Sequence, residues 1–183
     1  MSLPRVDPSK LTAAQISIRR ITPDDAAEIA KWHYPSPYEI YSLAPGDATW
    51  LLRPEFRYHA ALDEHHTLLG YFCYGEDARI PAALEQGLYA DERLMDIGLG
   101  MRPDNTGQGL GSAFLAAGLS FGEREFDAEG FRLTVAAWNV RAVRLYEKSG
   151  FSLAGACTVP ESGVPFLVLT RPTPHTAQVQ SPR

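Results

Sequence analysis

A strand pattern, a glycine-rich segment and a helix pattern follow one another directly between residues 94 and 126. Leu94–Met101 is typical of a strand but contains Gly98 and Gly100. Glycine inside a strand indicates a bulge or the close approach of another backbone or a ligand. From about Gly109 to Phe126 the apolar residues lie on two faces of a helix, which predicts a helix buried against a sheet. A chain with this unit has to fold around a sheet that carries helices.

The rest of the chain also alternates between strand and helix patterns. Helices are expected at 22–32, where Thr22 caps the first turn, and at 139–149, where Asn139 does so. Two long connections, the aromatic-rich 33–54 and the segment 75–93, carry no clear pattern. Further strands are expected at 16–21, 56–62, 67–74, 131–137, 151–159 and 164–170. This order predicts the α/β (α+β) class with a mixed sheet.

Length and composition restrict the classes of protein. The chain has 183 residues, which fits one domain, and we expect it to span 15–170. Segment 1–14 is expected to be loose, and 171–183, rich in Pro, Thr and Gln, is expected to be a disordered tail. A net charge of −5 without a basic stripe argues against a nucleic-acid partner. No apolar run reaches membrane-spanning length, and no signal segment opens the chain, so we expect a cytoplasmic protein.

The glycine-rich segment Thr106–Ser112 carries the chemistry. Glycines let several backbone N–H groups approach one point, and the N-terminus of the following helix adds a partial positive charge, which together favour a phosphate or pyrophosphate ligand. A glycine turn that only lets the helix pack on the strand fits this segment equally well. No Gly-Lys-Ser/Thr of a nucleotide triphosphate loop is present, and the spacing does not fit a dinucleotide fingerprint.

Residues 96–151 bring three features together in order. The strand ends in Met101-Arg102-Pro103, the glycine loop follows, and downstream comes Asn139-x-x-Ala142-x-x-x-Tyr146-x-Lys148-x-Gly150-Phe151. This stretch resembles the GNAT superfamily of acyl-CoA-dependent N-acyltransferases. The resemblance implies a single GNAT-like domain with a mostly antiparallel sheet of about six to seven strands, splayed in the middle, with helices on both faces. The family usually has Arg or Gln where this chain has Thr106, which is expected to lower the affinity for CoA.

The resemblance also implies an acetyl-CoA site. Backbone N–H groups of the loop would bind the pyrophosphate, and main-chain groups of the strand would hold the pantetheine arm and the thioester carbonyl. Asn139, besides capping its helix, would meet the cofactor arm. The cofactor-binding residues implied are Leu99, Gly100, Met101, Gly107, Gln108, Gly109, Leu110, Gly111, Ser112, Asn139, Ala142 and Tyr146.

Two residues are candidates for catalysis. The resemblance places the Tyr146 hydroxyl near the thioester sulfur, where it would protonate the departing thiolate; the alternative is a core aromatic residue. Asp96 is a carboxylate in an apolar strand, where an unpaired charge is costly. Asp96 is either a general base for the attacking ammonium or a member of an ion pair. One of Arg141, Arg144 and Lys148, which share a helix face, is a candidate for the 3′-phosphate of CoA.

The sequence constrains the acceptor substrate least. His33, Glu39 and Tyr41 in the aromatic segment are candidates for the acceptor side. The five histidines show no zinc spacing, so we expect no metal, and the two cysteines are expected to be buried free thiols. The function expected is transfer of acetyl from acetyl-CoA to a primary amine, a small molecule or a peptide N-terminus. Three alternatives stay open: a protein N-terminus as acceptor, a longer acyl group, and a non-catalytic acyl-CoA-binding module. A homodimer is also left open.

Overall fold

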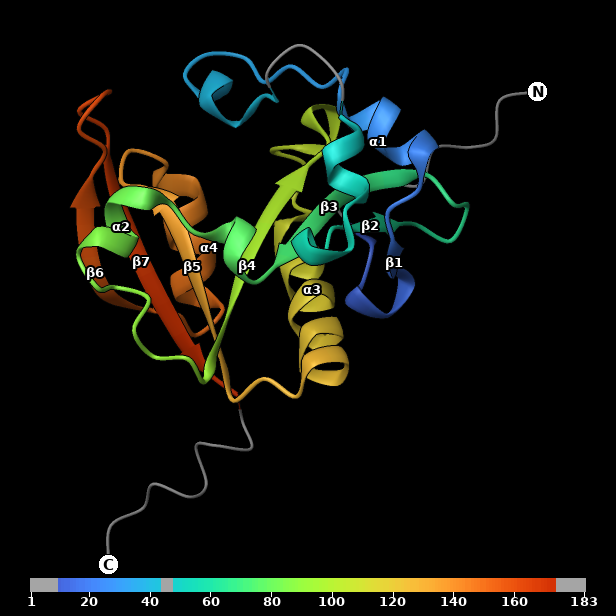
Figure 1. Ribbon diagram of the computed structural model, residues 1–183. Helices are drawn as coiled ribbons and strands as arrows, with labels where there is room; N and C mark the ends of the chain where they lie inside the picture. Colours follow the sequence, from blue (N-terminus) through green and yellow to red (C-terminus); the bar gives the residue numbers. More distant parts are fainter. Residues whose placement is uncertain (1–9, 44–47, 174–183) are drawn as a thin grey trace, which may run out of the picture. The chain divides into compact units, whose positions relative to one another are not determined.

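The computed structural model describes residues 10–43 and 48–173 of the chain (Figure 1). Its strands follow the expected ranges closely, except that the strand expected at 56–62 begins at His59, because Phe56 ends a 3-10 turn and Arg57 has a left-handed backbone conformation. The seven strands are β1 Ser17–Arg20, β2 His59–Leu62, β3 Leu68–Tyr74, β4 Leu94–Met101, β5 Gly130–Ala136, β6 Ser152–Thr158 and β7 Pro165–Pro172.

The described residues contain four α-helices and several single turns of 3-10 helix. Three helices were expected, although the first is shorter than 22–32, because it ends at Ile29. The fourth, α2, lies in the connection 75–93, which had no clear pattern. The helices are α1 Pro23–Ile29, α2 Pro81–Glu85, α3 Gly111–Phe126 and α4 Val140–Lys148. None of them combines the length and the apolar character needed to cross a bilayer.

The start of α1 is fixed by the capping residues that the sequence predicts. The Thr22 hydroxyl accepts a hydrogen bond from the Asp25 amide, and the Asp25 carboxylate accepts one from the Thr22 amide. This reciprocal pair satisfies two of the donors that a helix start leaves unpaired. Arg19 of β1 also donates two hydrogen bonds to the Asp25 carboxylate, so the cap joins the helix to the strand before it.

The chain forms two compact units. The first unit contains the described residues up to Phe72 together with Leu99–Gly118, and the second contains Cys73–Gly98 and the described residues from Leu119 onward. All three boundaries fall inside regular elements, because β3, β4 and α3 each contribute residues to both units.

The strands form a seven-stranded sheet in the order β1-β2-β3-β4-β5-β7-β6, in agreement with the expected six to seven strands. The pairs β1–β2, β2–β3, β5–β7 and β6–β7 are antiparallel, and β4–β5 is parallel. The β4–β5 ladder ends at the pair Asp96↔Arg132, although β5 continues along β7 to Ala136. Within the second unit, Ile97 and Gly98 therefore have no partner on β5, which is the splay that was expected.

In the first unit, α3 packs closely on β3. The rings of Phe72 and Phe114 stack with their centroids 4.5 Å apart. Gly118 lies over Phe72, and a methyl group there would come within 2.3 Å of the Phe72 ring. The missing side chain at Gly118 thus sets the distance between this helix and the strand.

In the second unit, α2 and α4 cover opposite faces of the strands β5, β7 and β6 (Figure 1). The α2 side has a core of its own, made of Ala82 and Ala83 of the helix with Tyr89, Cys157 and Val168. The helix is short, but its two buried alanines and Pro81 at its first position favour it.

Residues 171–173, which were expected to belong to a disordered tail, are ordered. Arg171 and Pro172 belong to β7, in register with Phe131 and Gly130 of β5. Thr173 is buried and donates two hydrogen bonds, from its amide and from its hydroxyl, to the carbonyl of Glu129. Ladder pairing thus outweighs the polar composition of these residues. Residues 174–183 of the predicted tail, and 1–9 of the predicted loose start, lie outside the described residues.

Candidate functional site

The glycine loop leads from β4 into α3. A 3-10 turn at Pro103–Asn105 follows the strand, and Gly107 and Gly109 then adopt φ of 78° and 82°. These left-handed conformations favour glycine over any residue with a Cβ atom. The Gln108 side chain donates a hydrogen bond to the Asp104 carbonyl at 2.5 Å between Nε2 and O, which braces the loop from one side.

The amides of this loop have almost no hydrogen-bond acceptors among the residues that the structure describes. The N–H of Thr106 bonds to Pro103, and that of Phe114 bonds to Leu110. Between them, no N–H from Gly107 to Ala113 has a hydrogen-bond acceptor among the described residues. These donors stand at the start of α3, a 16-residue helix whose dipole adds positive potential there. Such a group of free amides is suited to a phosphate or pyrophosphate.

Thr106 does not take part in that donor set. Its hydroxyl donates to the Pro103 carbonyl at 2.8 Å between Oγ1 and O, so it closes the turn before the loop. The threonine thus shapes the loop but brings no cationic or amide side chain to it.

The two glycines of β4 accommodate side chains from β3. A Cβ at Gly98 would lie 2.6 Å from the sulfur of Cys73, and a Cβ at Gly100 would lie 2.4 Å from the ring of Tyr71. The sequence pattern predicted a bulge or the close approach of another backbone or a ligand, whereas the nearest neighbours are side chains of β3. On this face of β4 the main chain is therefore covered by a thiol and a phenol ring.

The end of β4 is held by Tyr34, a residue that the sequence analysis did not single out. Its hydroxyl donates to the Met101 carbonyl at 2.8 Å between Oη and O. Burial raises the pKa of Tyr34 well above its usual value, so the hydroxyl keeps its proton and remains a donor. The amide of Tyr34 in turn donates to the Ser42 hydroxyl, which ties the segment that follows α1 to the strand.

Five aromatic residues of the first unit form a continuous group, here called the indole cluster. Trp32 stacks on Tyr71 with ring centroids 6.1 Å apart, and Tyr58 lies 5.8 Å from Tyr71. Trp50 meets Tyr58 edge-on at 5.4 Å and Phe56 at 6.2 Å. The Trp32 Nε1 is buried and has no hydrogen-bond partner among the described residues.

A second group of rings, here called the tyrosine cluster, contains the acceptor-side candidate Tyr41. Tyr41 meets Tyr34 edge-on and stacks on Tyr38, in both cases with centroids 6.5 Å apart. The other two acceptor-side candidates, His33 and Glu39, are exposed. Glu39 lies in the same 3-10 turn as Tyr38 and Tyr41.

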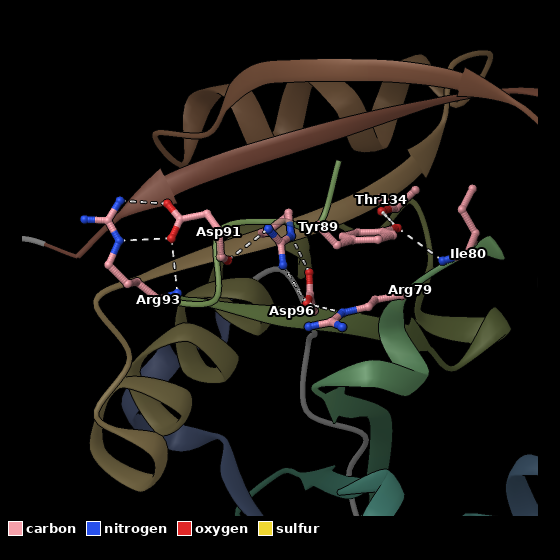
Figure 2. A network of polar contacts seen from close by, with 8 residues as sticks. Arg79, Ile80, Tyr89, Asp91, Arg93, Asp96 and Thr134 are labelled. Carbon is pink, nitrogen blue, oxygen red and sulfur yellow. Dashed lines mark hydrogen bonds and ion pairs between the residues drawn. The ribbon is translucent and has the colours of Figure 1, made fainter. Parts of the chain in front are cut away.

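Asp96, the candidate base, lies in a buried ion cluster of the second unit (Figure 2). Its Oδ1 accepts a hydrogen bond from Arg132 Nε at 2.6 Å, and its Oδ2 accepts bonds from Arg132 Nη2 at 2.9 Å and Arg79 Nε at 2.7 Å. The Asp96 side chain is 2% exposed and that of Arg132 is 1% exposed. This is the ion-pair alternative for Asp96, and the geometry favours a structural role.

Tyr89 completes that cluster and connects it to β5. The guanidinium carbons of Arg132 and Arg79 lie 4.9 Å and 5.5 Å from its ring centroid. Its hydroxyl shares a 2.6 Å hydrogen bond with Thr134 and accepts one from the Ile80 amide (Figure 2). The segment 79–91 is thereby pinned to the strands by charge and by cation–π contacts.

The remaining predicted site residues lie on or next to α4 in the second unit. Asn139 caps the helix as expected, because its Oδ1 accepts from the Ala142 amide at 3.2 Å. Tyr146 is the buried residue of α4 and packs edge-on against Phe151, 6.1 Å away. The three basic candidates for the 3′-phosphate, Arg141, Arg144 and Lys148, are exposed.

Neither a metal group nor a reactive thiol is present in the part of the chain that the structure describes. It has no set of three His, Cys, Asp or Glu side chains that could hold a metal ion. Both cysteines are buried thiols that form no disulfide within the described residues, and burial raises the pKa of Cys157, which makes its thiolate scarce at neutral pH.

Comparisons with known proteins point in one direction. The family model described as "Acetyltransferase (GNAT) family" matches residues 24–151. No curated protein matches the chain significantly.

Solved structures with the same fold include a GNAT-family acetyltransferase from Bacillus anthracis, 16% identical, with a TM-score of 0.66 over 86% of this chain and 95% of that one. Spermidine/spermine N-acetyltransferase SpeG from Vibrio cholerae is 15% identical, with a TM-score of 0.65 over 92% and 99%. Aminoglycoside acetyltransferase AAC(6')-Ib, solved with coenzyme A and kanamycin, is 19% identical, with a TM-score of 0.65 over 91% and 99%. At identities this low, the similarity to these structures establishes the fold alone.

Proposed function

Because the chain belongs to the GNAT family of acetyltransferases, we propose that it transfers the acetyl group of acetyl-CoA directly to a primary amine. The observation that carries the proposal is the run of unpaired amides at the start of α3. Family membership adds the cosubstrate, and solved structures of the same fold hold acetyl-CoA or CoA.

The glycine loop binds the pyrophosphate of CoA in this proposal. The N–H groups from Gly107 to Ser112 serve as donors, and the dipole of α3 adds to the attraction. Main-chain donors are insensitive to side-chain identity, so Thr106 in place of Arg or Gln weakens the site without removing it. Asn139 and Ala142 meet the cofactor arm, and a basic residue of α4 reaches the 3′-phosphate.

The end of β4 holds the acyl group. Parallel pairing with β5 stops at Asp96, so the strand beyond it can offer main-chain groups to pantetheine rather than to a neighbouring strand. The thioester oxygen needs a hydrogen-bond donor. The Met101 carbonyl already accepts a bond from Tyr34, so the amides of Leu99 and Met101 are the groups assigned to the thioester, where they also stabilise the oxyanion that forms during attack.

The transfer needs one base and one acid. The acceptor ammonium loses a proton, its nitrogen attacks the carbonyl carbon, and the carbon–sulfur bond breaks. The Tyr146 hydroxyl donates a proton to the departing sulfur. Asp96 would have to give up a guanidinium bond to accept the proton of the amine, so the acceptor-side carboxylate Glu39 is preferred as its first recipient.

The proposal is tested by weakening the loop alone. Gly109→Ala places a Cβ on a left-handed residue among the unpaired amides, and it should lower acetyl-CoA affinity at least tenfold in a calorimetric titration. Gly163→Ala is the matched control, because Gly163 also has positive φ, at 66°, with open space around its Cβ position. Both variants carry a backbone penalty of about 1 kcal/mol, but only the first should lose affinity.

Two further arms separate the alternatives. A loss of affinity with dephospho-CoA would support a basic residue at the 3′-phosphate. Release of free CoA thiol in the presence of amines distinguishes an enzyme from a module that only binds acyl-CoA. Absence of acetyl-CoA binding to the parent protein at millimolar concentration would overturn the proposal.

A further inference from the structure

The environment of the acceptor follows from the rings of the first unit. Seven aromatic residues lie between residues 32 and 58 of the chain. Many of them are partly accessible rather than core residues, because Tyr34, Tyr38, Tyr41, Trp50 and Phe56 are all of intermediate exposure. The indole cluster and the tyrosine cluster together thus present aromatic surface, which a flat apolar group can contact.

The two clusters reach neighbouring residues of β4. The indole cluster ends in Tyr71, whose ring lies against Gly100 so closely that a Cβ there would be 2.4 Å away. The tyrosine cluster begins with Tyr34, whose hydroxyl bonds to the carbonyl of Met101. An amine that attacks a thioester held by the end of β4 therefore has aromatic rings on its own side of the strand.

The same region has little net charge to attract a polycation, and two of its carboxylates are already paired. The carboxylate of Asp25 is paired with Arg19, and that of Glu28 with Lys31 and Arg102. Over residues 16–62 the chain carries five Lys and Arg and six Asp and Glu, so the region is almost neutral. A ligand with several ammonium groups needs several free carboxylates to replace its hydration.

We propose that the acceptor is a monoamine carried on an aromatic body, an arylalkylamine, whose ring packs against the indole and tyrosine clusters beside Gly100 and Met101. This inference rests on the proposed acetyl transfer and specifies its substrate class. Aromatic pairs prefer offset or edge-to-face contacts, and such contacts add to the gain from burying apolar area. The Nε1 of Trp32 is buried and has no hydrogen-bond partner among the described residues, so it is a donor that a polar substituent on the substrate ring can satisfy.

The first test compares acceptors with the unmodified protein and acetyl-CoA. Phenethylamine and tyramine represent the proposed class, hexylamine is an aliphatic monoamine, and spermidine and kanamycin are polycations. We expect kcat/KM for the two arylalkylamines to exceed that for hexylamine at least tenfold and that for either polycation by more. Tenfold corresponds to 1.4 kcal/mol, which is the scale of one aromatic contact.

The second test removes one ring. Tyr41→Ala deletes the ring between Tyr34 and Tyr38 and should lower kcat/KM for phenethylamine about tenfold, with little change for hexylamine and none in acetyl-CoA affinity. The control is Leu84→Ala, which removes an exposed apolar side chain of α2 and should leave the ratio of the two amines unchanged. A purely structural role of Tyr41 would lower kcat/KM for both amines equally.

The outcomes separate this inference from the proposed function. Acetylation of spermidine or kanamycin in preference to the arylalkylamines, or an unchanged ratio in Tyr41→Ala, would overturn the substrate class and leave acetyl transfer standing. Failure to bind acetyl-CoA would overturn acetyl transfer itself. Preference for arylalkylamines that is lost in Tyr41→Ala would support both.

Discussion

Replacing Asp96 by asparagine tests whether this residue holds the fold or moves a proton. Asparagine keeps the size of the side chain but turns one of its oxygens into an NH₂ donor that faces guanidinium nitrogens. Asp96 receives three guanidinium bonds of 2.6–2.9 Å, and Arg132 is as buried as Asp96 itself. Removing one partner of a buried ion pair costs about 3–5 kcal/mol, because the other charge stays buried without compensation.

Such a loss is easily measured. For a chain of this length, each kcal/mol lowers Tm by about 2–4 °C, so Asp96→Asn should melt about 6–20 °C below the parent protein. Asp96→Leu combined with Arg132→Met removes both buried charges and should recover much of that loss. Arg79, whose side chain is 26% exposed, can turn its guanidinium to solvent in the double variant.

The activity of the folded variant separates the two roles. If Asp96 is structural, kcat of the folded Asp96→Asn protein at low temperature should stay within a few fold of the parent. A general base contributes about 10²–10⁴-fold. Unchanged Tm together with a hundredfold fall in kcat would therefore refute the structural role and restore Asp96 as the base.

Three further predictions concern stability. Gly118→Ala should lower the free energy of unfolding by about 1–3 kcal/mol, because the added methyl group overpacks Phe72 despite the better helix propensity of alanine. Urea unfolding measures this loss, with Ser120→Ala on the exposed face of α3 as the control. Equal losses in the two variants would contradict the prediction. Burial raises the pKa of Asp25, but hydrogen bonds from Arg19 and Thr22 outweigh burial, and the net pKa lies below the usual 3.8. The carboxylate thus stabilises the fold fully above pH 3.8, and this stabilisation is lost as pH falls through the lowered pKa. The difference in free energy of unfolding between the parent protein and Asp25→Asn should therefore shrink in acid. Parallel plots of that free energy against pH for the two proteins would contradict this. Finally, both cysteines should resist a disulfide reagent until the protein is unfolded; rapid labelling of native protein would show that they are accessible.

The sequence predicted the elements well where local patterns decide the structure. The strand Leu94–Met101 has its expected bounds, and the helix after Asn139 starts where its cap predicts. The sheet, its splay and the glycine loop followed from periodicity and from the family resemblance. Local signals of this kind depend on residues a few positions apart.

The parts that were missed depend on residues far apart in the chain. Tyr34 and Met101 are separated by 67 positions, and Asp96 and Arg132 by 36, and no periodicity encodes such partners. The charge of Asp96 in an apolar strand did signal that a partner was needed, but it did not say which one. The short helix α2 was missed because five residues give too little pattern to recognise.

The order of residues 171–173, at the start of the predicted tail, was missed for a similar reason. Arg171 and Pro172 have the composition of a linker, yet they extend β7 because β5 offers backbone partners beside them. A sheet can thus recruit polar residues that would be disordered alone.

Transfer of acetyl from acetyl-CoA to an amine is tested most directly by following the acetyl group itself. Acetyl-CoA labelled in its acetyl carbons is incubated with the protein and a panel of primary amines, and the products are identified by mass spectrometry. We expect a labelled N-acetyl amine, and we expect Tyr146→Phe to lower kcat by a larger factor than it raises KM for acetyl-CoA. Binding of acetyl-CoA without any labelled product across the panel would contradict it.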